Sequence, residues 1–311
     1  MPELELIGVP FDGYGRPSRQ AAAAQELRDA GLLEVISSLA VHQGDLELPP
    51  PDGGRGLDTG LINEPALLAM TEQLHTRVGS ALALSRFPIV VGGDCSSLLG
   101  IVSGARSTDP GIGVVFVDGH EDTMPLDVSE DGEAANCAIG LLLGLTGRLM
   151  RGPLAERLPR LDRGDLAMLG QRDGAWRRQF NVGSLRDYGV WLRSEVEVAA
   201  DPVSAGRQAV GHVQLSSDRW WLHVDLDVLD PTVFPAQGLP DVADEPGGLG
   251  WQQLSEVLVA CAGEGGCIGI SIAIYDPDQD ENGAGARAIV QLLDDVLGAV
   301  SRHASGDART G

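Results

Sequence analysis

The fold of this chain follows from two acidic stretches, VDGHED at residues 117–122 and HVDLDVLDP at residues 223–231. Each one overlaps or follows an apolar run of strand length, residues 113–117 and 220–224. In an extended segment, side chains two positions apart point to the same side. Acidic side chains gathered in this way repel one another unless a cation holds them together. The two stretches therefore predict a divalent-metal site at the ends of two strands.

The alternation in these stretches selects five side chains as candidate metal ligands. They are Asp118, His120 and Asp122 in the first stretch, and Asp225 and Asp227 in the second. Carboxylates and imidazole suit hard to borderline ions such as Mn²⁺. Aspartates at strand ends also form turns or cap helices, so the prediction rests on the joint pattern and not on any one residue.

Candidate strands and helices alternate along the chain. Apolar runs predict strands at residues 4–9, 89–91, 113–117, 166–169, 220–224 and 268–274. Segments rich in Leu and Ala predict helices at residues 19–30, 65–85, 134–148, 254–262 and 284–302. This alternation predicts an α/β fold with a mostly parallel central sheet that is covered on both faces. Ligands then bind beyond the carboxyl ends of the strands, where both acidic stretches lie.

The organisation of the chain predicts one domain over residues 1–311. Stretches rich in Pro and Gly at residues 49–60 and 237–250 predict loops, and the second loop could form a wall of the site. Residues 305–311 predict a disordered tail.

The charge of −23 argues against binding to nucleic acid or to anionic membranes, whose phosphates need cationic partners. All 22 residues of the Lys and Arg type are arginines. An acidic, solubilising surface explains this excess of negative charge, and attraction of a cationic substrate is the alternative.

The four cysteines form no Cys-x-x-Cys pair, which favours reduced thiols. No apolar run approaches membrane-spanning length and no signal peptide is recognised, so the sequence predicts a cytoplasmic protein.

A third motif, GGDCS at residues 92–96, falls at the end of another candidate strand. The order GGDCS, DGHED, DLDVLDP resembles the arginase/agmatinase (ureohydrolase) superfamily, whose members carry Gly-Gly-Asp-His, Asp-Ala-His-x-Asp and Asp-x-Asp-x-x-Asp-Pro motifs. The stretches IGVP at residues 7–10 and LGQRD at residues 169–173 look similar too. The resemblance thus covers nearly the whole chain.

The resemblance implies a three-layer α/β/α sandwich that holds two Mn²⁺ ions and forms a homo-oligomer. Asp118 and Asp225 would each bridge both ions, while Asp122 and the residue at position 95 complete one ligand set. His120 and Asp227 would complete the other set. Two such ions would turn a bridging water into hydroxide near neutral pH. That hydroxide would attack a trigonal carbon and release an amine.

The chain departs from the family pattern first at Cys95, which occupies the position of a histidine ligand. A thiolate there can bind Mn²⁺ but favours softer divalent ions more than imidazole does. The alternative is an inert buried thiol beside one weak or empty metal position.

Two further departures concern the substrate. Arginases have a proton-shuttling histidine shortly after the second motif, but residues 129–136 contain none, so Glu133 and Asn136 join Asp122 as catalytic candidates. These two residues could equally open the following helix. The family's guanidinium-holding glutamate is replaced by Ile274, and Asp276 and Asp278 are the substitutes expected to bind substrate. A surface turn is the alternative for this Asp/Pro cluster.

These features together predict a metal-dependent hydrolase of linear, non-peptide C–N bonds. Its substrate would be a small, cationic guanidino, hydroxyguanidino or formimidoyl compound, with urea or a related product released. The alternative is an inactive protein of the same fold that binds a metal or a partner, which the missing histidine and glutamate favour. The retained acidic sets oppose that alternative, because clustered like charges destabilise a fold that needs no metal.

Overall fold

The computed structural model describes residues 2–36, 41–127, 129, 132–145, 152–238 and 247–307. One eight-stranded sheet forms its centre, and every strand pairing in it is parallel. The strands follow the spatial order β2-β1-β3-β8-β7-β4-β5-β6. They are β1 Leu4–Gly8, β2 Val41–His42, β3 Phe87–Val91, β4 Gly113–Val117, β5 Leu166–Gln171, β6 Trp191–Ser194, β7 Trp220–Asp225 and β8 Cys267–Ala273.

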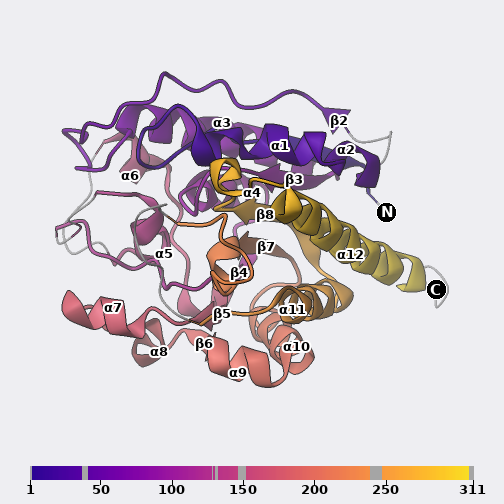
Figure 1. Cartoon of the computed structure of the whole chain (residues 1–311). Coiled ribbons are helices and arrows are strands. Elements are labelled where there is room, and N and C mark those ends of the chain that lie inside the picture. Colours follow the sequence, from indigo (N-terminus) through magenta and orange to yellow (C-terminus); the bar gives the residue numbers. More distant parts are fainter. Residues whose placement is uncertain are drawn as a thin grey trace.

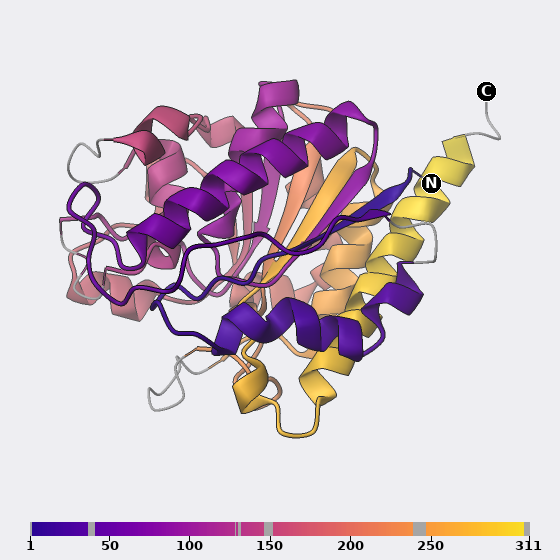
Figure 2. The same ribbon diagram turned by 90° about the horizontal axis from the view of Figure 1, so that it is seen from above.

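Helices cover both faces of this sheet. They are α1 Ala23–Asp29, α2 Leu32–Val35, α3 Glu64–Ala83, α4 Ser97–Thr108, α5 Ala138–Leu143, α6 Pro153–Arg157, α7 Gly174–Gln179, α8 Leu185–Tyr188, α9 Glu195–Ala200, α10 Pro202–Val213, α11 Trp251–Gly263 and α12 Ala284–Asp307. In Figure 1, α5 and α6 lie to the left of the strands and α11 and α12 to the right. Figure 2 shows α3 on one side of the sheet and α1 and α12 on the other. The expected three-layer α/β/α architecture is confirmed.

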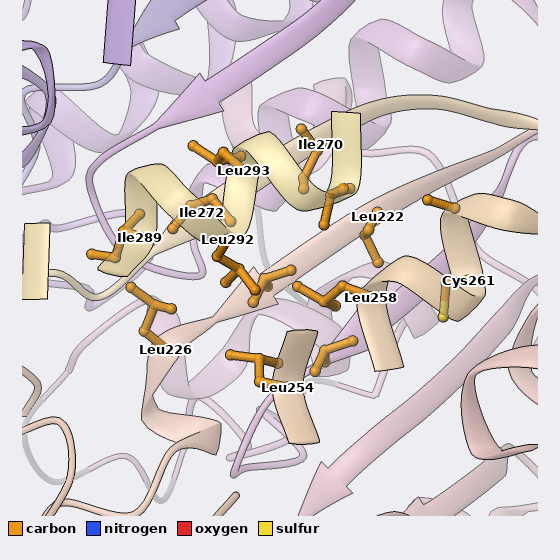
Figure 3. Packing of buried hydrophobic residues seen from close by; sticks show 14 of the residues in the cluster. Leu222, Leu226, Leu254, Leu258, Cys261, Ile270, Ile272, Ile289, Leu292 and Leu293 are labelled. Atoms are coloured by element: carbon orange, nitrogen blue, oxygen red, sulfur yellow. The ribbon is translucent and has the colours of Figure 1, made fainter. Parts of the chain in front are cut away.

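Two apolar cores, one on each face, follow from the alternation of side chains along the strands. Val115 and Val117 of β4 belong to the core beneath α10, α11 and α12, whereas Val114 and Phe116 belong to the core beneath α3 and α4. Figure 3 shows leucines and isoleucines of α11 and α12 packed against those of β7 and β8. Each fully buried side chain of this kind contributes about 1.5–3 kcal/mol, so the sheet is a rigid support.

The register of the central strands sets their carboxyl ends at one level. Val117 of β4 pairs with Val224 of β7, and Val224 pairs with Ile272 of β8. Val91 of β3 also pairs with Ile272. The residues that come next in each strand, Asp118 and Asp225 among them, therefore emerge side by side.

A glycine pair turns the chain at the end of β3. Gly92 and Gly93 have φ angles of 95° and 70°, in the left-handed region that favours glycine. A Cβ on Gly92 would lie 2.8 Å from the carbonyl oxygen of Val9. After this turn, the Cys95 side chain lies beside Asp118 and Asp225 at the ends of β4 and β7.

Some of the observed helices and strands differ from those that the sequence predicts. Helices α4 and α10 were not expected, because their many small residues give a weak periodic signal. The edge strand β6 was not expected either, because it is only four residues long. The helix expected at residues 134–148 is a 3-10 turn, Ala135–Cys137, followed by α5, which ends at the left-handed Gly144. Residues 146–151 lie outside the described part of the chain.

The two predicted loops and the predicted tail have different outcomes. Residues 49–60 form a loop, whereas most of the second loop, residues 239–246, lies outside the described residues. The tail expected from residue 305 is helical through Asp307, and residues 308–311 are not described. Among the described residues, every helix is too short or too polar to span a bilayer.

Candidate metal centre

The centre of the site is formed by acidic residues at the ends of β4 and β7 and by Cys95 after β3. The Cys95 Sγ atom lies 3.2 Å from Asp118 Oδ2 and 2.7 Å from Asp225 Oδ2. All three residues are at most 2% exposed. The structure thus brings together three chain segments that are far apart in sequence, as the strand register requires.

A second group of ligand candidates surrounds His120. Its Nδ1 atom lies 2.8 Å from Asp227 Oδ2 and 3.7 Å from Asp118 Oδ1. Backbone amides hold both carboxylates in place: the His120 amide donates to Asp118 Oδ1, and the Gly119 amide donates to Asp227 Oδ1 over 3.0 Å. The Asp227 amide likewise donates to Asp225 Oδ1 over 2.8 Å.

Asp118 belongs to two compact sets of possible ligand atoms. One set consists of Cys95, Asp118 and Asp122, and the other of Asp118, His120 and Asp227. Within each set the ligand atoms lie within 4.8 Å of one another. Asp118 is therefore common to both groups of possible ligands.

Asp122 is held in an unusual backbone conformation. Its φ angle of 47° lies in the left-handed region, which costs a residue other than glycine about 1–3 kcal/mol. Its side chain is buried, and its Oδ2 atom has no hydrogen-bond partner among the described residues. A buried oxygen without a partner lowers the stability of the fold unless a ligand binds to it.

The protonation of these groups reflects their crowding. Burial raises the pKa of Asp118 to about 7, and the charge of Asp227 adds to the rise. Burial, together with the neighbouring carboxylates, also raises the pKa values of Asp122 and Asp225 well above their ordinary range. Burial alone would raise the pKa of Asp227, but the neighbouring His120 outweighs it and lowers that pKa below its ordinary value. Burial alone would lower the pKa of His120, but Asp227 and Asp118 raise it well above its ordinary value.

The donor set fits divalent metal ions. Crowded, buried carboxylates whose pKa values are raised in the absence of a cation are stabilised when an ion binds to them. A buried oxygen without a partner among the described residues likewise gains one. The oxygens and the imidazole suit Mn²⁺, and the thiol of Cys95 adds a softer donor. The metal-ligand candidates selected from the sequence therefore lie together.

A small cavity of about 130 Å³ opens onto these ligands. Its described lining consists of Tyr14, Gln20, Cys95, His120, Asp122, Glu133, Ala135, Asn136, Asp225, Asp227, Gly238 and Ile274. The catalytic candidates Glu133 and Asn136 lie in this lining, where Asn136 Nδ2 donates to Glu133 Oε2 over 3.4 Å. Both residues precede α5, so opening that helix and facing the cavity are compatible roles.

Gln20 is a lining residue that sequence reasoning missed. It is 3% exposed, and its Oε1 atom has no hydrogen-bond partner among the described residues. It follows Arg19, which has a φ angle of 64°. No motif marks this position, because it reaches the cavity only through the tertiary fold.

Ile274 occupies the place after β8 where the family pattern has a glutamate. Its φ angle is 64°, a strained value for a β-branched residue. Because Ile274 lines the cavity, it presents an apolar surface where the family pattern has a carboxylate that binds the substrate.

The carboxylates expected to replace that glutamate lie elsewhere. Asp276 is buried and accepts hydrogen bonds from Arg19 and Gln279 at 3.1 and 3.0 Å. Asp278 is exposed and accepts from Ser18 Oγ at 3.1 Å. Neither belongs to the described cavity lining, which differs from the expected substrate contact. The reason is local: the Asp276–Asp278 turn folds back on its own loop and on the segment before α1.

Other residues of the motifs support the site from behind. Asp94 Oδ1 accepts from the Ser96 amide at 2.9 Å, and Asp230 Oδ1 accepts from the Thr232 amide at 2.8 Å, so each holds its own turn. Arg172 donates to the carbonyl oxygen of Asp227 over 2.6 Å. Asp173 binds Arg177 over 2.9 Å.

Comparisons with known proteins agree with this geometry. The arginase family model matches residues 3–298. An arginase of Eremothecium gossypii is 26% identical over 297 residues, which cover 89% of this chain and 70% of that protein. The solved arginase of Bacillus caldovelox has a TM-score of 0.82 at 23% identity, with coverage of 96% of this chain and 99% of that chain. Formimidoylglutamase from Bacillus subtilis has a TM-score of 0.72 at 21% identity, with coverage of 96% and 87%. The chain therefore belongs to the arginase family.

Proposed function

We propose that this protein is a metal-dependent hydrolase of a linear, non-peptide C–N bond in a guanidino, hydroxyguanidino or formimidoyl-type small molecule. The observation that supports this most is the cavity itself, in which ligand candidates from three strand ends face Glu133 and Asn136. Both an arginase and a formimidoylglutamase are among the similar proteins, so the substrate is proposed as a class.

Two Mn²⁺ ions are the proposed cofactors, held as the two sets that share Asp118 suggest. Asp122 and Cys95 would complete one set, and His120 and Asp227 the other, with Asp225 between them. Divalent ions bound there supply Lewis acidity that activates water and polarises the substrate.

The side chains of the chain itself would move the protons. Asp122 Oδ2, which has no other partner among the described residues, would accept a proton from the attacking water. Glu133 lies in the same cavity and would pass a proton to the departing amine. Asn136, which donates to Glu133, would orient that carboxyl group.

The cavity volume limits what reaches these groups. About 130 Å³ is well below the volume of a pocket for a drug-sized ligand, which favours a small substrate. Its acidic lining favours a cationic or hydrogen-bond-donating group. Gln20 offers an uncharged acceptor in the same lining.

Metal analysis combined with product assays tests this proposal. We expect purified protein to hold about two metal ions per chain, and Mn²⁺-loaded protein to release urea, formamide or ammonia from a panel of guanidino, hydroxyguanidino and formimidoyl compounds. Glu133→Gln serves as the matched variant, since it keeps the size of the side chain and removes its proton transfer. Absence of both metal and turnover would contradict the proposal.

A second candidate is a protein that binds metal without turnover. Ile274 favours it, because an apolar residue faces the cavity where the family pattern places a clamp for the substrate. Stoichiometric metal with no product from the whole panel would support this candidate.

The family resemblance also suggests a homo-oligomer, which analytical sedimentation would test.

A further inference from the structure

A chain of buried hydrogen bonds ends on the sulfur of Cys95. Trp221 Nε1 donates to Ser271 Oγ over 2.9 Å, and Ser271 Oγ lies 2.7 Å from His223 Nδ1. His223 Nε2 lies 3.3 Å from Cys95 Sγ. All four residues are at most 1% exposed.

Strand pairing explains why these side chains meet. His223 of β7 pairs with Ser271 of β8, and Ser271 pairs with Val90 of β3 on its other side. The three strands are neighbours in the sheet, and Cys95 follows β3. The His223 ring also stacks on Phe116 of β4, with centroids 5.3 Å apart and an angle of 6° between the planes. Its position is therefore fixed on several sides.

The hydrogen bonds in this chain run in one direction. The indole N–H of Trp221 can only donate, so Ser271 Oγ accepts from it. The hydroxyl proton of Ser271 then points to His223 Nδ1, its other recorded partner. A neutral imidazole that accepts at Nδ1 carries its proton on Nε2. The fully buried, stacked ring is expected to be neutral, so Nε2–H is directed at the sulfur.

We propose that His223 is a positioning residue whose Nε2–H donates to the Cys95 sulfur and stabilises it as a metal-binding thiolate. The inference rests on the metal centre of the proposed function. In the metal-free protein the thiol proton is directed at Asp225 Oδ2, and this proton leaves when a metal replaces it. The hydrogen bond from His223 remains and offsets part of the negative charge on sulfur.

The chain thus has no histidine at position 95, but the imidazole of His223 lies next to the Cys95 sulfur. The imidazole lies behind the candidate ligand and not in its place, since the compact ligand sets contain Cys95 and not His223. Groups that orient metal ligands in this way typically contribute 10- to 100-fold to metal affinity.

Cobalt binding to the whole protein tests this inference without relying on turnover. Co²⁺ bound to a thiolate gives a sulfur-to-metal charge-transfer absorption band, and chelator competition gives the dissociation constant. We expect the band in wild type and its loss in Cys95→Ala. His223→Phe, which keeps a stacked ring, should weaken Co²⁺ binding about 10- to 100-fold. His223→Gln, which keeps an N–H near the sulfur, should recover most of that loss.

Several results would overturn the inference. A wild-type cobalt spectrum without the thiolate band means that Cys95 is not a ligand. Equal affinities for wild type and His223→Phe mean that the hydrogen bond is not used. A loss in His223→Gln as large as in His223→Phe means that the ring acts in another way. If His223→Phe does not fold, as judged by circular dichroism, Ser271→Ala replaces it, and unchanged Co²⁺ affinity in that variant contradicts the directional chain.

The same measurements separate this inference from the proposed function. A wild-type thiolate band without any product in the substrate panel removes the hydrolase and leaves the role of His223 standing. Product release without the thiolate band supports the hydrolase and removes the proposed role of His223.

Discussion

Two walls of the cavity differ in how closely they keep the family pattern. The metal wall is defined here as the lining residues Cys95, His120, Asp122, Asp225 and Asp227 together with Asp118, which does not line the cavity itself but shares their ligand sets. It matches the family pattern at every position except Cys95. The substrate wall, defined as Gln20, Glu133, Asn136 and Ile274, lacks both the histidine and the glutamate of that pattern.

The difference follows from what holds each wall in place. The metal wall sits at the ends of paired strands or directly after them, where the register of the sheet fixes each side chain. The substrate wall comes from loops and short turns, which tolerate change without disturbing the core. The metal wall is therefore expected to tolerate fewer substitutions than the substrate wall.

Removal of one metal-wall carboxylate should have the largest effect. Asp225→Asn keeps the shape of the side chain but removes a charge that an ion would neutralise. We expect metal affinity to fall by more than about 100-fold, since even groups behind the ligands contribute up to that amount. Calorimetric titration with Mn²⁺ measures this loss. Asp230→Asn is the matched control, because Asp230 holds its own turn and should leave affinity close to wild type.

The metal wall should also make the metal-free protein less stable as pH rises. With the pKa of Asp118 at about 7 and those of Asp122 and Asp225 also raised, the folded state retains protons that the unfolded state releases near pH 4. The free energy of unfolding therefore falls between about pH 5 and 7, by about 1.4 kcal/mol per pKa unit and group. Thermal melts in a chelator should show a Tm that falls over this range, and Mn²⁺ should oppose the fall. A metal-free Tm that rises over this range contradicts the assignment.

A carboxylate restored to the substrate wall should change substrate preference. Ile274→Glu removes a β-branched side chain from a left-handed position and adds a charged acceptor to the cavity. A charge-assisted hydrogen bond contributes about 1.5–3 kcal/mol, so kcat/KM for a guanidinium substrate should rise about 10- to 100-fold. Ile274→Gln, of equal length and without charge, should give little of this gain. Equal kcat/KM values for the two variants would show that this position does not select the substrate.

Loss of the amide on the same wall should have a smaller effect. Gln20→Leu removes an acceptor that has no partner in the described protein. If this acceptor binds the substrate as proposed, the variant loses one neutral hydrogen bond. Such a bond contributes about 0.5–1.5 kcal/mol, which corresponds to a rise in KM of about 2- to 10-fold. Steady-state kinetics at constant metal content measures it. The exposed Gln25→Leu is the control, and equal KM values in both variants would remove Gln20 from the substrate wall.

The smallest effect is expected outside both walls. Asp278→Ala should change the free energy of unfolding by less than about 0.5 kcal/mol and leave KM unchanged, because this carboxylate is exposed and contacts only Ser18 among its recorded partners. Chemical denaturation and kinetics check both values. A clear rise in KM would return Asp278 to the substrate contacts that the sequence suggested.

The sequence alone determined the α/β class and the metal wall. Apolar runs that end in alternating Asp and His predict both the strands and the side from which their ligands emerge, because side-chain direction along a strand has a period of two. The turns held by Asp94 and Asp230 are local in the same way, since each short polar side chain accepts a hydrogen bond from the backbone two residues on. These are features that a few consecutive residues decide.

The tertiary structure decided the substrate wall and the support of Cys95. Gln20 reaches the cavity from a turn before α1, and Asp276 turns away from it toward Arg19. His223 looks like an ordinary core residue until strand order places it behind the sulfur of Cys95. Contacts of this kind depend on which strands become neighbours and how loops return. That depends on the packing of the whole chain, which no local pattern of residues encodes.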